Sequence, residues 1–147
     1  MPKVTTFIRS MTSTVMLSLV LGQPSLAQEA PAPSLDLELN AAQPSDKGCR
    51  LTFVVANKLG SDLTKAAFEI ALFNNGGVVD RLTVLDFKDL PKGKTKVIRF
   101  DLSGVDCSGL DRVLINQATE CAGPEVAPDA CMRQLKLNSR TDTEFST

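Results

Sequence analysis

Four runs of alternating apolar and polar residues lie between Cys49 and Leu102, separated by Gly, Asn, Asp and Pro. Successive side chains of a strand point to opposite faces, so this alternation predicts consecutive antiparallel strands that each bury one face. The predicted strands are residues 51–56, 67–73, 78–87 and 96–102. Their expected inward residues are Leu51, Phe53 and Val55, then Phe68, Ile70 and Leu72, and finally Ile98, Phe100 and Leu102.

The run over residues 78–87 does not keep one phase. Leu82 and Val84 fit one phase of the alternation, whereas Leu85 and Phe87 fit the other. Such a change predicts either a β-bulge or a strand that crosses from one sheet to another.

Three further segments complete the predicted fold. Residues 35–39 alternate strictly and predict an edge strand, and residues 112–121 and 131–140 predict two more strands. Residues 122–130 contain two prolines and are expected to hold at most one helical turn. About seven strands in a chain of this length predict an all-β fold, an immunoglobulin-like antiparallel β-sandwich.

Residues 1–27 have the pattern of a secretory signal peptide. Lys3 and Arg9 precede a short apolar stretch over residues 11–21, and small residues stand at the two cleavage subsites, Ser25 and Ala27. We expect cleavage before Gln28, a flexible Pro/Ala tail over residues 28–33 and a β-sandwich domain over residues 34–147. The apolar stretch is too short to span a bilayer, so no stable membrane insertion of the mature chain is expected.

Charge narrows the choice of partners. Without Lys3 and Arg9 the mature chain keeps 14 basic and 17 acidic residues, a net charge of −3. Binding to phosphates needs clustered cations, so nucleic acid is not an expected partner.

Four cysteines, Cys49, Cys107, Cys121 and Cys131, all follow the predicted cleavage site. An even number of cysteines in an exported chain predicts two disulfides, and the absence of His and of any C-x-x-C pair disfavours a metal site. An immunoglobulin-like sheet places the strand that follows Cys49 beside the strand that precedes Cys107. We therefore predict Cys49–Cys107, and we predict Cys121–Cys131 across a hairpin.

The sequence gives little support to catalysis. The chain has no His, which removes Ser-His-Asp and Cys-His arrangements, and disulfides leave no thiol nucleophile. Carboxylates could pair for acid–base work, although a solvated surface explains their positions better. These candidates are Asp80, Asp86, Asp89 and Asp101. No enzymatic activity, cofactor or metal is expected.

Two polar groups are candidates for partner contact. Arg81 and Arg99, with Asp80 and Asp101 nearby, predict a cross-strand ion-pair ladder or a partner-binding face, and the ladder is favoured. Residues 139–142, Ser-Arg-Thr-Asp, could cap the last strand or contact a partner, and the cap is favoured.

The order of strands and turns over residues 34–138 resembles immunoglobulin-like or fibronectin-III-like modules of exported bacterial proteins. A more specific resemblance is carried by LTFVVANKLGSDLTKAAFEIALF, GGVVDRLTVLDFKDLPKGKTKV, RFDL, RVLIN and LKLNSRTDTEF. These runs, within residues 35–145, resemble small exported alphaproteobacterial proteins labelled "Tat pathway signal sequence domain protein". The label implies twin-arginine export, but Phe7-Ile8-Arg9-Ser10 contains one arginine, which favours general secretion. The resemblance supplies no reaction, cofactor or site residue.

Export, disulfides and the strand pattern together predict a periplasmic or secreted protein. The expected function is a non-catalytic structural or protein-interaction module of the cell envelope, with an envelope protein as its partner. The alternative is small-molecule or glycan binding at one end of the sandwich, where the loops over residues 57–65, 88–95 and 122–130 could cluster.

Overall fold

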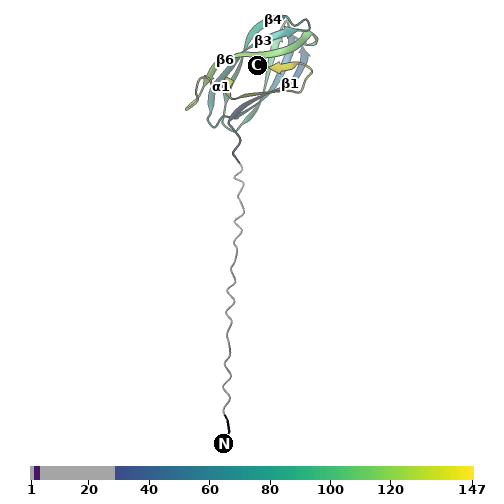
Figure 1. Cartoon of the computed structure of the whole chain (residues 1–147). Coiled ribbons are helices and arrows are strands. Elements are labelled where there is room, and N and C mark those ends of the chain that lie inside the picture. Colours follow the sequence, from purple (N-terminus) through teal and green to yellow (C-terminus); the bar gives the residue numbers. More distant parts are fainter. Residues whose placement is uncertain (1, 4–28) are drawn as a thin grey trace. The chain divides into compact units, whose positions relative to one another are not determined.

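The computed structural model describes residues 2–3 and 29–147, and residues 31–147 form one unit (Figure 1). The predicted signal peptide lies outside the described residues except for Pro2 and Lys3. Residues 29–33 are exposed and have no regular secondary structure. In the part of the chain that is described, no helix has the length and apolar character needed to cross a membrane.

Eight strands, one 3₁₀ turn and one short helix make up this unit. The strands are β1 (Ser34–Ser45), β2 (Gly48–Lys58), β3 (Leu63–Asn74), β4 (Val79–Leu90), β5 (Thr95–Ser103), β6 (Leu110–Ala122), β7 (Leu135–Ser139) and β8 (Glu144–Ser146). The 3₁₀ turn η1 spans Cys107–Gly109, and the helix α1 spans Ala130–Arg133. The all-β prediction is confirmed.

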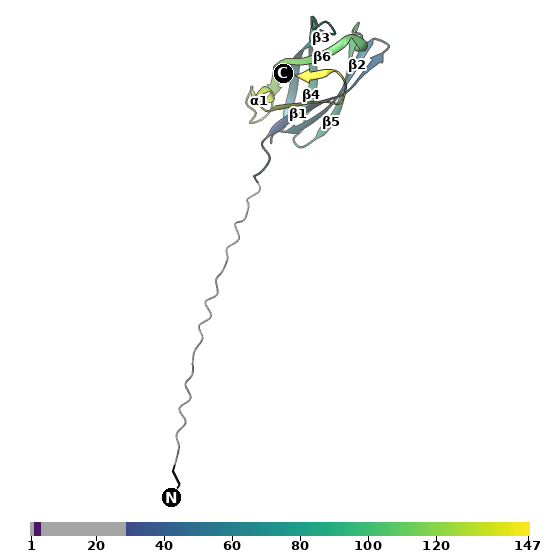
Figure 2. The same cartoon turned by 45° about the vertical axis from the view of Figure 1, so that its right-hand side comes forward.

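The strands form two four-stranded sheets with the orders β5-β2-β1-β7 and β4-β3-β6-β8. Figures 1 and 2 show the strands of the two sheets. Most neighbours are antiparallel, but β7 pairs with β1 and β8 pairs with β6 in parallel. The predicted edge position of residues 35–39 is therefore wrong. Because β7 returns to pair with β1, that strand lies inside its sheet and its three leucines, Leu35, Leu37 and Leu39, are 0–1% exposed.

The core lies between the inward faces of the two sheets. Every predicted inward residue of β2 and β3 is fully buried, from Leu51, Phe53 and Val55 to Phe68, Ile70 and Leu72. Ile98 and Phe100 pack against this core but are only partly buried, because β5 is an edge strand of its sheet.

The register with β3 shifts at two points within residues 78–87, at Asp80 and just beyond Asp86, as the predicted bulge would require, but the change of phase lies between these two points. Pairing with β3 continues without a register shift from Leu82 to Asp86. Leu82 and Val84 are 57% and 52% exposed, whereas Leu85 and Phe87 are 2% and 0% exposed. The two phases are therefore the two faces of one strand, and both faces carry apolar residues.

The C-terminal segment differs from the prediction in two ways. The predicted strand over residues 131–140 begins with the helical turn α1, and only Leu135–Ser139 is a strand. The predicted polar tail contains the eighth strand, β8, which places Phe145 in the core at 8% exposure. A three-residue strand is too short to show alternation, so the sequence pattern did not reveal it.

Both predicted disulfides are present. Cys49 and Cys107 are joined with a Cα–Cα distance of 5.0 Å, and Cys121 and Cys131 with 5.8 Å. The adjacency of β2 and β5 that predicted the first bond is also present. The hairpin from which the second bond was predicted is not formed. Cys131 lies in α1, and the strands on either side of it, β6 and β7, belong to different sheets.

Candidate functional site

The outer surface of the sheet β4-β3-β6-β8 has an apolar centre. In the strand register, Ala71 of β3 lies between Leu82 of β4 and Leu114 of β6. Two residues further along β3, Phe73 lies opposite Val79. In the other direction along β4, Val84 is two residues from Leu82 and so lies on the same face. We call these six residues the apolar face: Ala71, Phe73, Val79, Leu82, Val84 and Leu114.

The apolar face is open to solvent along β4. Val79, Leu82 and Val84 are 47%, 57% and 52% exposed, whereas Ala71 in the centre is only 4% exposed because larger side chains flank it. Scattered exposed apolar residues are normal, but a contiguous group on one sheet marks a surface suited to protein contact.

Polar and charged side chains border this face in fixed positions. The Arg112 guanidinium lies 3.9 Å from the centre of the Phe73 ring, a cation–π contact. On the other side of Ala71 along β3, the Glu69 carboxylate accepts hydrogen bonds from Asn116 Nδ2 at 2.6 Å and Gln117 Nε2 at 3.2 Å. An apolar centre with a polar rim is the usual anatomy of a protein interface.

The loops predicted to cluster at one end of the sandwich do converge. The buried Asn57 amide donates to the carbonyls of Ser61 and Leu90, at 2.9 and 2.7 Å, and so joins the loop over residues 57–65 to the loop over residues 88–95. Gly123 brings in the third loop, because a Cβ there would stand 2.1 Å from the Asp62 carbonyl oxygen. The hollow beside these loops measures about 170 Å³. The hydrogen bonds of Asn57 and the close approach of Gly123 to Asp62 explain why these loops lie together.

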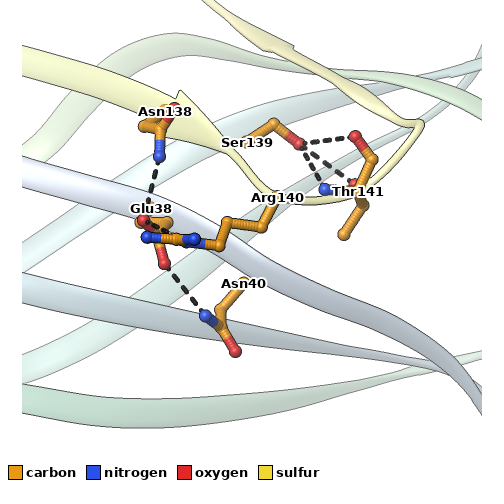
Figure 3. A network of polar contacts seen from close by, with 6 residues as sticks. All are labelled: Glu38, Asn40, Asn138, Ser139, Arg140 and Thr141. Carbon is orange, nitrogen blue, oxygen red and sulfur yellow. Dashed lines mark hydrogen bonds and ion pairs between the residues drawn. The ribbon is translucent and has the colours of Figure 1, made fainter.

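A polar network on the other sheet joins β1 to the C-terminal segment (Figure 3). The Glu38 carboxylate accepts from Asn40 Nδ2 and Asn138 Nδ2, both at 2.9 Å, and from Arg140 Nε at 3.1 Å. The hydrogen bond from Asn40, followed by those from Asn138 and Arg140, holds the pKa of Glu38 below its ordinary value of 4.5.

The Ser-Arg-Thr-Asp segment at residues 139–142 contributes to the same region. Ser139 Oγ donates to the Thr143 carbonyl at 2.8 Å and accepts from the Thr141 backbone N–H at 3.2 Å. The buried Thr143 hydroxyl then donates to the Leu110 carbonyl. These contacts fasten the turn between β7 and β8, in agreement with the favoured capping role.

The Glu38 network makes a testable contribution to acid stability. A carboxyl whose pKa is lowered by folding stabilises the fold at pH values above its unfolded pKa, and this contribution is lost as the pH falls through the folded value. Glu38→Gln is therefore expected to give a smaller drop in urea midpoint between neutral pH and about pH 3 than the parent chain shows. Glu29→Gln, in the exposed tail, is the matched control and should keep the parent's pH dependence. An unchanged pH dependence in Glu38→Gln would contradict the contribution of the ionised Glu38 carboxylate to stability.

The carboxylates considered for acid–base work are mostly engaged with cations. Asp101 pairs with Arg50 at 2.9 Å, Asp86 with Lys88 at 2.7 Å and Asp89 with Lys96 at 3.4 Å. Hydrogen bonds from Arg50 and from Lys88 lower the pKa of Asp101 and Asp86 respectively, which favours the ionised form of each.

The ion-pair ladder predicted for Arg81, Arg99, Asp80 and Asp101 is not formed, because within the described residues none of these four side chains pairs with another. Asp101 reaches across to Arg50 of the neighbouring strand, but Arg81 instead donates to the Ser103 carbonyl at 2.8 Å. Arg81 thereby links β4 to β5 across the two sheets.

The fold and its bonds define the class of the protein as an all-β domain of two sheets with two disulfides. No protein-family model and no curated protein matches the chain. Among solved structures, the chain is similar to the trimeric lipoprotein SadB of Salmonella enterica, with 20% identity and a TM-score of 0.42. That similarity covers 48% of this chain and 40% of the other chain.

Proposed function

We propose that the mature chain is an exported, non-catalytic interaction module of the bacterial cell envelope, which binds a protein partner through the apolar face. The observation that carries this proposal is the contiguous group of apolar side chains on β4, β3 and β6, with Leu82 and Val84 more than half exposed. The two disulfides support an oxidising compartment outside the cytoplasm, which means the periplasm or the exterior.

The strand order supports an immunoglobulin-like sandwich. In immunoglobulin domains, the first, second and fifth strands share one sheet, and the third and sixth lie in the other. Here β1, β2 and β5 share one sheet, and β3 and β6 lie in the other together with β4. Two strands depart from this pattern. β7 pairs in parallel with β1 instead of joining the sheet of β3 and β6, and β8 runs parallel to β6, whereas the last immunoglobulin strand runs antiparallel to its neighbour.

The shape of the surface favours a protein over a small ligand. Drug-sized ligands are usually held in concave sites of about 300 to 1,000 Å³. The apolar face is an open sheet surface, which matches the broad interfaces between proteins. Small-molecule or glycan binding at the converging loops is the second candidate, but the hollow there measures only about 170 Å³.

The proposal predicts that charges on the apolar face abolish partner capture. The exported chain would be crosslinked in intact periplasm, and its partners identified by mass spectrometry for the parent and for Leu82→Glu and Leu114→Lys. Both substitutions place a charge where the partner would otherwise bury apolar surface, so the partner's recovery should fall by about tenfold or more.

Val97→Lys is the matched control for this experiment. Val97 is 62% exposed, but it lies on β5 in the other sheet. The control should capture the partner as the parent does, and urea unfolding would verify that all variants fold. Equal capture by the parent and by the folded face variants would contradict the proposed function.

A further inference from the structure

A carboxylate borders the apolar face in the middle of its sheet. Glu69 is on β3, which has β4 on one side and β6 on the other. In the strand register Glu69 lies between Val84 of β4 and Gln117 of β6. Its neighbours on the same face of β3 are Ala67 and Ala71, which are 3% and 4% exposed. A partner that covers the apolar face therefore also covers this carboxylate.

Only one oxygen of the Glu69 carboxylate has hydrogen-bond partners among residues 29–147. Asn116 Nδ2 and Gln117 Nε2 both donate to Oε1, at 2.6 and 3.2 Å, whereas Oε2 accepts from neither. Both donors are neutral amides, so they hold the carboxylate in place and leave its charge uncompensated. The second oxygen is therefore available to a donor from another molecule.

The two carboxylates nearest to Glu69 in the register carry their own cations. Asp86 of β4 and Glu120 of β6 both align with the residue of β3 two positions before Glu69. Asp86 pairs with Lys88 at 2.7 Å, and Glu120 pairs with Lys65 at 2.8 Å. No lysine or arginine of the described residues pairs with Glu69 in this way. An approaching cation would therefore be attracted mainly to Glu69.

We propose that the partner places a lysine side chain on Glu69, with the ammonium group at Oε2 and the methylene stem against Ala71 and Val84. This inference rests on the proposed function, because it names the chemistry of the partner at the same face. Burying a carboxylate without a counter-charge is costly, so a partner that covers Glu69 has to supply a cation. An ion pair at this position also fixes the register of the partner on the sheet.

The single available oxygen favours lysine over arginine. Arginine binds a carboxylate best through two parallel hydrogen bonds, which need both oxygens. At Glu69 two amides already occupy Oε1. The lysine ammonium is a compact charge that needs only one oxygen, and its long stem can cover apolar surface. Val84 lies next to Glu69, is 52% exposed and offers that surface.

Zero-length crosslinking tests the ion pair. A water-soluble carbodiimide joins a carboxylate to an amine in contact with it through an amide bond, and the reagent takes up the water that is lost. In intact periplasm the exported chain should give a product in which peptide mapping places a lysine of another protein on Glu69.

Partner capture measures the effect of the charge. Glu69→Gln keeps an acceptor for the two amides but removes the counter-charge of the lysine, so the partner's recovery should fall by about tenfold or more. Glu120→Gln is the matched control, because Glu120 already has Lys65 as its cation, and it should capture the partner as the parent does. Urea unfolding would verify that both variants fold.

A defined peptide gives the same test without the partner. In acetyl-Lys-Thr-Leu-Thr-Leu-amide the lysine and both leucines lie on one face of an extended chain. In a nuclear magnetic resonance titration this peptide should bind the parent about threefold more tightly than the peptide with Glu in place of Lys, as expected for an exposed ion pair. Glu69→Gln should remove that preference. Equal binding of the two peptides by the parent would overturn the inference.

The outcomes separate this inference from the proposed function. If Glu69→Gln captures the partner as the parent does while Leu82→Glu loses it, the inference is wrong and the proposed function stands. If Leu82→Glu also captures the partner, both are wrong. If Glu69→Gln loses the partner but the parent shows no lysine linked to Glu69, the assignment of lysine is overturned in favour of arginine.

Discussion

Replacing Cys49 and Cys107 together by alanine is expected to lower the free energy of unfolding by about 4 kcal/mol. The reason is the size of the loop, since the bond joins residues 58 positions apart and so restricts the unfolded chain strongly. The bond fixes the start of β2 to η1, and Cys49 is fully buried. Urea unfolding of the oxidised parent and the double variant, fitted with a common slope, gives the difference.

The second disulfide provides the matched control. Cys121 and Cys131 are 10 positions apart, so the same model predicts a smaller loss of about 3 kcal/mol for their double alanine variant. A larger loss at this pair than at Cys49–Cys107 would contradict the loop-entropy explanation. It would indicate that the contacts of α1, which contains Cys131, determine the stability of that region.

The alternation of residues in β2 and β3 predicted their buried faces correctly because both strands lie inside their sheets. Phe53 and Ile70 have strands on both sides and a facing sheet, so each inward position is fully covered. Ile98 and Phe100 alternate in the same way but lie on an edge strand, where one flank stays open. The alternation indicates on which face of the sheet a side chain lies, and the position of its strand in the sheet determines how completely that side chain is buried.

Long-range pairing is the part of the fold that local pattern could not predict. The parallel contacts of β1 with β7 and of β6 with β8 join segments far apart in sequence, and nothing in residues 35–39 marks them as an inner strand. The disulfide prediction succeeded where a topological rule supplied such a pairing, namely the adjacency of β2 and β5.

The apolar face illustrates the same limit for the candidate site. Its signal was visible as the two apolar phases of residues 82–87, but the sequence could not distinguish a bulge from a strand that is apolar on both faces. The strand register distinguishes these two possibilities, because it aligns Leu82 with Ala71 and Leu114 on neighbouring strands. Ala71 and Leu114 carry no functional signal alone, and they become part of a surface only through this alignment.

Phe53→Ala is expected to lower the free energy of unfolding by about 3 to 5 kcal/mol, as for other large-to-small changes in a core. Phe53 is fully buried, and its ring lies 5.5 Å from Phe87, 5.5 Å from Phe145 and 5.9 Å from Phe100. These contacts join β2 to β4 and β8 of the facing sheet, so the cavity would open between the two sheets.

Phe100→Ala is the comparison that isolates burial. Phe100 contacts Phe53 and Phe87, at 5.9 and 5.1 Å, but β5 leaves it partly exposed. Less apolar surface is lost from the core, and the neighbouring space stays open to water, so its loss should be smaller than that of Phe53→Ala. Urea unfolding of both variants at one pH measures the difference. Equal losses would mean that the contact between the aromatic rings, which the two residues share, outweighs the depth of burial in holding the two sheets together.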